Sequence, residues 1–108
     1  MTIPTLEELT LLSEHVCQAL ADPKRMQLLY ILAEQPRHVN ELSEILGMAQ
    51  STVSRHLSIL RYRGLVVTQR DGTRMIYWLH NPKIITVLNS MQAILRDTIE
   101  EQTDTMRI

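Results

Sequence analysis

The stretch QSTVSRHLSILRYRGL, residues 50–65, decides the fold of this chain and raises the question of what its surface faces. Val53, Leu57 and Leu60 recur at spacings of four and three residues, which predicts a helix with one buried stripe. Most other positions carry Ser, Thr, Gln or Arg, and no position carries an acid. A helix whose outer face meets only water commonly carries Glu and Lys at its exposed positions. The stretch therefore predicts a core helix whose outer surface suits an anionic partner.

Charge is distributed unevenly along the chain. The whole sequence has a formal net charge of −1, but residues 1–49 carry seven acids and three bases, a net charge of −4. Residues 50–75 carry five arginines and a single acid, Asp71, which gives a net charge of +4. Residues 76–108 carry four acids and three bases, a net charge of −1. A local basic block of this kind indicates a surface for a polyanion.

Composition predicts a single globular domain over residues 1–108. The hydrophobic fraction is 44%, and because Phe is absent the core must consist mainly of Leu, Ile, Val and Met. No apolar run approaches the roughly 18 residues of a membrane helix, and the N-terminus has no signal-peptide pattern. We therefore expect a soluble, cytoplasmic protein that does not enter a membrane.

Two helices are predicted before residue 37. Thr5 is a suitable N-cap for the first, since Glu8 stands three residues on and completes a capping box. Asp22 caps the second, and Pro23 suits its first position. Pro36 ends the second helix nearby.

A short third helix precedes the basic helix. Asn40 is the predicted cap of the third helix and Gly47 its C-terminal stop. Gly64 ends the basic helix in the same way. Two helices joined by a tight turn at this spacing predict a helix-turn-helix.

The pattern then changes from helix to strand. Asp71-Gly72 is a strong hairpin signal, and it separates two β-prone runs at about residues 65–70 and 74–79. A last helix follows, with Asn81 as its cap. The expected fold is mainly α with a β-hairpin, a winged helix-turn-helix of five helices and a two-stranded wing.

The chemistry of the basic helix and the hairpin suits DNA. Gln50 can present its amide to adenine, and Arg55 can donate two hydrogen bonds to guanine. Small hydroxyls let the helix approach phosphates closely, and the helix N-terminus adds partial positive charge. Arg70 and Arg74 flank the hairpin tip, from which they could reach an adjacent minor groove or the backbone.

The stretches ALADPKRMQLLYIL, VNELSEILGMAQSTVSRHLSILRYRGLV and RDGTRMIYWL resemble the arsenic-repressor (ArsR/SmtB) family of bacterial transcription regulators over roughly residues 15–95. The resemblance implies a dimer built from the first and last helices, operator binding and repression. It also implies a DNA-binding set, in which the last two residues belong to the wing: Gln50, Ser51, Thr52, Ser54, Arg55, His56, Arg70 and Arg74.

The chain departs from this family at the positions that bind metal in many relatives. His38 and Asn40 stand where a Cys-x-Cys pair would be. The positions that match a zinc site between the paired last helices are Asn81, Lys83, Ile94 and Asp97. Since Lys83 is a cation and Ile94 has no donor atom, we expect neither of the usual metal sites, and no cofactor is predicted.

Several alternatives stay open at this stage. Cys17, the single cysteine, is expected to be a small buried hydrophobe, with a redox-active interface thiol as the alternative. Control by a histidine metal site across the dimer, by an organic ligand, or, without any small-molecule ligand, by abundance or a partner protein is also compatible with the sequence. No nucleophile–base pair or phosphate loop indicates an enzyme. The competing function is a winged-helix adaptor that binds protein instead of DNA.

Overall fold

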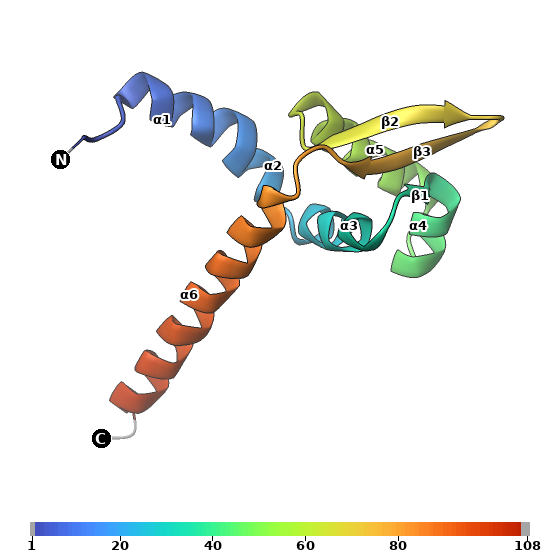
Figure 1. Ribbon diagram of the computed structural model, residues 1–108. Helices are drawn as coiled ribbons and strands as arrows, with labels where there is room; N and C mark the ends of the chain where they lie inside the picture. The colour runs from blue at the N-terminus through green and yellow to red at the C-terminus, as the bar shows by residue number, and fades with distance from the viewer. Residues whose placement is uncertain (1, 107–108) are drawn as a thin grey trace.

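The computed structural model describes the backbone of residues 2–106 and the side chains of residues 2–103. One helical run at the N-terminus consists of α1 (Leu6–Leu12), the π-helical turn η1 (Ser13–Cys17) and α2 (Gln18–Leu20). The elements that follow are α3 (Pro23–Glu34), β1 (Arg37–His38), α4 (Val39–Leu46), α5 (Gln50–Tyr62), β2 (Val66–Asp71), β3 (Arg74–Leu79) and α6 (Lys83–Met106). With the first run counted once, the predicted five helices and the wing hairpin are confirmed (Figure 1).

Local capping chemistry places the starts of α1 and α3 and the end of α4 where the sequence predicts them. Thr5 Oγ1 accepts from the Glu8 backbone N–H at 3.1 Å, and Glu8 Oε2 accepts from the Thr5 N–H at 3.2 Å. Asp22 Oδ1 accepts from the Lys24 N–H at 2.7 Å, with Pro23 at the first helical position. Gly47 ends α4 in the left-handed region, with φ of 63°, which a residue with a Cβ rarely adopts.

One predicted helix cap is wrong, and one strand of the sheet was not predicted. Helix α4 begins at Val39 with His38 at the cap, so Asn40 is already inside the helix. The sheet has three strands in the order β1-β3-β2, because Arg37 and His38 pair antiparallel with β3. A two-residue strand is too short to produce an alternating pattern, and its pairing joins residues about forty positions apart in the chain.

The core lies between α3, α4 and α5 and the inner face of the sheet. The most completely buried side chains come from the three helices and the start of α6: Leu28, Leu29, Leu42, Val53, Leu57, Leu60 and Leu88. On β3, Tyr77 packs into this core while Trp78 is half-buried, as the alternation along a strand predicts.

Helices α1 and α6 extend away from this core, on the side opposite the wing tip (Figure 1). No residue of α1 is buried, and Leu6 is 81% exposed. Exposed leucines on an extended helix are unusual for a monomer and mark a surface that another chain can cover. Within residues 2–106, no helix is both long and apolar enough to cross a membrane.

Candidate nucleic-acid interface

Helix α5 is divided sharply into a buried and an exposed face. Its buried residues are Val53, His56, Leu57 and Leu60. The residues open to solvent are Gln50, Ser51, Arg55, Ser58, Arg61 and Tyr62, and those half-buried at the side are Thr52, Ser54 and Ile59. The outer face therefore carries hydroxyl, amide and guanidinium groups that can reach a ligand, and it carries no carboxylate.

The first turn of α5 is open to an anion. Its N-cap is Ala49, which offers no side-chain oxygen to the first backbone N–H groups, and no acid lies in the first turn. Helix N-termini with free N–H groups attract phosphate. The turn before it is fixed by the Met48 N–H, which donates to the Ser43 carbonyl at 3.1 Å. The start of α5 is thus held firmly and is not capped by the chain itself.

The wing carries both predicted arginines on exposed positions. Strands β2 and β3 pair Arg70 with Met75 and Asp71 with Arg74. Directly opposed residues share a face and neighbouring residues alternate, so the two arginines leave the hairpin on opposite faces. The sequence assigns both Arg70 and Arg74 to the wing, whereas the strand register puts their side chains on opposite faces of the hairpin.

A hollow of about 430 Å³ joins the wing to the start of α5. Gln50 and Ser54 line it from α5, and Arg74 lines it from the wing. Asn40 at the start of α4 and Thr73 in the turn also line it, and the sequence did not identify either as a candidate. Asn40 and Thr73 line the same hollow only because α4 and the hairpin lie next to each other in the folded chain, and no local sequence motif predicts that arrangement.

His38 has two carboxylate partners. Its Nδ1 lies 2.7 Å from Glu41 Oε1, and its Nε2 lies 2.8 Å from Asp71 Oδ2 on the wing. These hydrogen bonds, that of Glu41 first and that of Asp71 second, raise the pKa of His38 above its ordinary value. Asp71 is 33 residues further along the chain, so the sequence offers no signal for this contact.

His56 does not belong to the exposed set. Its side chain is only 4% exposed, because it lies on the inner face of α5. Its Nδ1 lies 3.5 Å from Arg25 Nη1 of α3. Burial is the main cause that lowers the pKa of His56, which favours the neutral ring. The inclusion of His56 among the DNA-contacting residues is therefore corrected: it supports α5 from behind.

Cys17 also differs from the expectation. The thiol is exposed on η1, so the prediction of a buried hydrophobe is wrong. The neighbouring His15 ring does not turn toward it, since His15 Nδ1 lies 3.1 Å from the Leu11 carbonyl oxygen.

The positions that correspond to metal ligands in relatives have other roles here. Asn81 accepts a hydrogen bond from the Lys83 N–H at 3.0 Å and so caps α6, while Ile94 is 64% exposed on the same helix. Over the described residues, no group of three or more His, Cys, Asp or Glu side chains is arranged to hold a metal ion.

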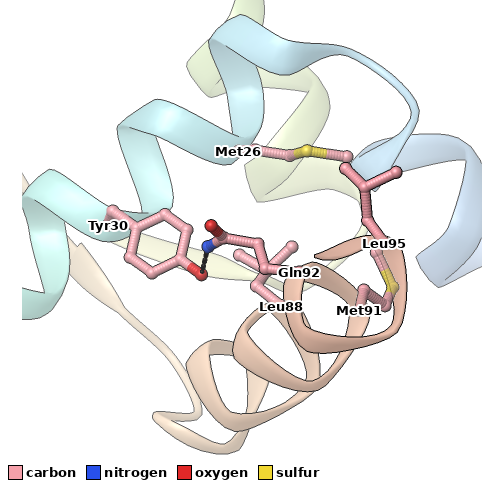
Figure 2. A pocket seen from close by; sticks show the side chains of 6 residues that line it. All are labelled: Met26, Tyr30, Leu88, Met91, Gln92 and Leu95. Atoms are coloured by element: carbon pink, nitrogen blue, oxygen red, sulfur yellow. Dashed lines mark hydrogen bonds between the residues drawn. The ribbon is translucent and has the colours of Figure 1, made fainter. Parts of the chain in front are cut away.

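A second hollow, of about 400 Å³, lies between α3 and α6, far from the wing. Figure 2 shows its apolar walls, formed by Met26, Leu88, Met91 and Leu95. At one edge the Tyr30 hydroxyl accepts a hydrogen bond from the Gln92 amide and donates to Asn89 Oδ1 at 2.7 Å. This polar contact joins α6 to α3, while most of the hollow offers only apolar surface.

Comparison with known proteins identifies the family. Residues 22–68 match the sequence model of the bacterial regulatory protein, arsR family. KmtR, an HTH-type transcriptional regulator of Mycobacterium tuberculosis, is 41% identical over 75% of this chain. The chain spans only 62% of the length of KmtR. Rv0081, an uncharacterized HTH-type transcriptional regulator of the same organism, is 34% identical over 89% of this chain and 85% of its own length.

Solved structures agree with this assignment. The crystal structure of Rv0081 aligns with 94% of this chain and 99% of its own, with a TM-score of 0.77 and 31% identity. A homodimeric winged helix-turn-helix DNA-binding domain of Mycobacterium bovis, described as a possible ArsR-family regulator, aligns over 94% of this chain and 95% of its own. Its TM-score is 0.74 and its identity 29%. The chain belongs to the ArsR family of bacterial regulatory proteins, a family of regulators and not of enzymes, and carries a winged helix-turn-helix.

Proposed function

We propose that this protein is a dimeric, sequence-specific DNA-binding regulator of transcription that acts as a repressor in the cytoplasm. The observation that carries the proposal is the hollow shared by α5 and the wing, which Gln50, Ser54 and Arg74 line. It joins an acid-free helix face to a cationic loop. A DNA duplex offers the matching surface, with base edges in the major groove and phosphates beside it.

The candidate residues divide into two roles. Gln50 and Arg55 have the groups that read adenine and guanine edges, and both are exposed. The three hydroxyl residues near the helix start, together with the uncapped first turn, suit phosphate oxygens: Ser51, Thr52 and Ser54. Arg74 on the wing faces the same groove, and Arg70 on the other hairpin face suits the neighbouring backbone.

The dimer is proposed to form through α1 and α6. Helix α6 exposes a stripe of large apolar side chains on one face, Val87, Met91, Ile94, Leu95 and Ile99. Helix α1 exposes Leu6, Leu9 and Leu12 in the same manner. The hollow between α3 and α6 is continuous with this stripe through Met91 and Leu95, so a second copy would cover both. The M. bovis relative is homodimeric, which supports the same arrangement here.

A two-fold dimer sets the geometry of the operator. Two α5 helices related by symmetry would enter successive major grooves about 34 Å apart, which requires a near-palindromic site. Affinity should fall steeply with salt, since arginine–phosphate contacts release counterions.

The test is a selection of bound genomic fragments, followed by sequencing and a gel shift with the enriched site. We expect a near-palindromic sequence to be enriched, and Arg74→Ala to weaken binding to all sequences alike. If no fragment is retarded even at low salt, the DNA-binding proposal fails and the protein-binding adaptor becomes the better account. Under the same assay, Cys17→Ser shows whether the exposed thiol carries any response of DNA binding to oxidants.

A further inference from the structure

His38 connects the helix-turn-helix to the tip of the wing. It is the last residue of β1 and the cap of α4, and its side chain is 13% exposed. One ring nitrogen faces Glu41 in the first turn of α4, and the other faces Asp71 at the end of β2, both within 2.8 Å. The imidazole thus lies between two carboxylates that belong to different parts of the fold.

Both contacts can be donated only by a protonated ring. A neutral imidazole carries a hydrogen on one nitrogen and a lone pair on the other, so it can donate to Glu41 or to Asp71 and not to both. The hydrogen bonds to the two carboxylates raise the pKa of His38, while burial of the ring and then the Arg74 guanidinium of β3 act in the opposite direction. Arg37 on β1 faces the same cluster, with Nη1 3.7 Å from Glu41 Oε2. Hydrogen bonds from the His38 backbone and ring lower the pKa of Glu41, so it remains an acceptor.

The contact with Asp71 affects the part of the wing that would meet DNA. Asp71 is paired with Arg74 across the hairpin, and Arg74 lines the hollow opposite Gln50 of α5. The contact between His38 and Asp71 therefore connects α4 to the hairpin residue that pairs with Arg74. Without the proton, the ring can donate to only one of the two carboxylates, so the link that runs from Glu41 through His38 to Asp71 is broken at one end.

We propose that His38 is a positioning residue that fixes the wing to α4 in its protonated form, so that operator binding is coupled to uptake of a proton. The coupling to DNA rests on the function proposed above, whereas the attachment of the wing does not. Lowering the pH through the neutral range would then strengthen binding, and raising it would weaken binding.

The direction of this pH dependence follows from the raised pKa of His38. The attachment is complete below the ordinary histidine pKa of about 6.5 and is lost as the pH rises through the raised value of the folded protein. Asp71 and Glu41 are partly exposed, so water screens both contacts. We therefore expect a modest change, about twofold to fivefold weaker binding at about pH 8.5 than at about pH 6.

The attachment is tested first on the free protein. An NMR titration of the histidine ring signals, with His38 assigned by their loss in His38→Gln, should give a pKa above about 6.5. Asp71→Asn keeps an acceptor but removes the charge, and it should lower that pKa. A His38 pKa at or below the ordinary value, or one that Asp71→Asn leaves unchanged, would overturn the proposal without reference to DNA.

The coupling is tested on the selected operator across the same pH range. Binding by the unaltered chain should weaken as the pH rises, and His38→Gln should give a nearly flat profile. His80→Gln, at an exposed position after β3, is the matched control and should keep the full dependence. A flat profile for the unaltered chain, or a sloping one for His38→Gln, overturns the coupling. Failure to bind any DNA at any pH contradicts the proposed function instead, and the ring titration still decides the attachment.

Discussion

Helices α5 and α6 each carry a stripe of apolar residues at helical spacing, but the chain covers the two stripes to different extents. In α5 the stripe is fully buried within the chain, since Val53, Leu57 and Leu60 are 0% exposed. In α6 only the first part of the stripe, Ile84 and Leu88, reaches the core, and the rest stays open to solvent.

The difference teaches that periodicity identifies an apolar face and does not identify what covers it. The stripe of α5 is covered because α3 and α4 precede it and pack on it, which leaves its polar face free for another molecule. The stripe of α6 extends beyond the core (Figure 1), so an equally apolar surface becomes available to a second copy. Under the proposed function, α5 offers DNA its polar side and α6 offers a second copy its apolar side.

The largest expected effect is the loss of stability when the buried stripe of α5 is shortened. Leu57→Ala removes a completely buried side chain and should lower the free energy of unfolding by about 2–5 kcal/mol. Urea unfolding followed by circular dichroism measures it. Ser58→Ala, at an exposed position of the same helix, should change stability by less than about 0.5 kcal/mol. Equal losses for the two variants would contradict the division of α5 into faces.

A charge on the open stripe should break the dimer and leave the fold intact. Ile94→Asp would place an unpaired carboxylate in an apolar interface, which should weaken dimerisation by at least about 2 kcal/mol. Sedimentation over a range of protein concentrations measures the dissociation constant, and circular dichroism checks the helix content. Thr86→Asp adds the same charge to α6 outside the stripe and should leave the dimer unchanged. A dimer that survives Ile94→Asp would place the interface elsewhere.

The polar face of α5 is tested by its arginine. Arg55→Ala should weaken binding to the selected operator by about 1–3 kcal/mol and relax preference at one base pair. Arg55→Lys keeps the charge but loses the two-pronged donor, so it should lose selectivity more than overall affinity. Lys83→Ala, at the start of α6, controls for net charge. Unchanged affinity and footprint for Arg55→Ala would remove this residue from the interface.

The smallest effect concerns the start of the N-terminal run. Thr5→Ala removes the acceptor for the Glu8 N–H and should destabilise α1 by about 1 kcal/mol. Hydrogen exchange of the α1 amides should rise, while exchange in α5 should not change. Faster exchange in both helices would show that α1 is coupled to the core more tightly than its exposure indicates.

The sequence predicts those parts of the fold that depend on near neighbours. The caps at Thr5 and Asp22, the stop at Gly47 and the hairpin at Asp71-Gly72 are each encoded within a few residues. Strand β1 and the contact between His38 and Asp71 depend on segments that meet only after folding, so no local pattern reports them.

The candidate site divides in the same way. Spacing along α5 predicts the exposed positions of Gln50 and Arg55, because helical geometry alone sets them. The same spacing puts His56 beside the buried stripe, three residues after Val53, but it does not identify Arg25 of α3 as the neighbour of the ring. Nor does it separate Arg70 from Arg74, because a shift of one residue in strand register would pair the two arginines directly and put both on the same face of the hairpin.

The central account is that the polar face of α5 and the tip of the wing bind one DNA duplex together. The most direct measurement is the change in backbone amide NMR signals when the selected operator is added. We expect the largest changes at residues 50–55 and 73–74, with α6 changing little. Changes confined to α1 and α6, with the start of α5 unaffected, would contradict the account.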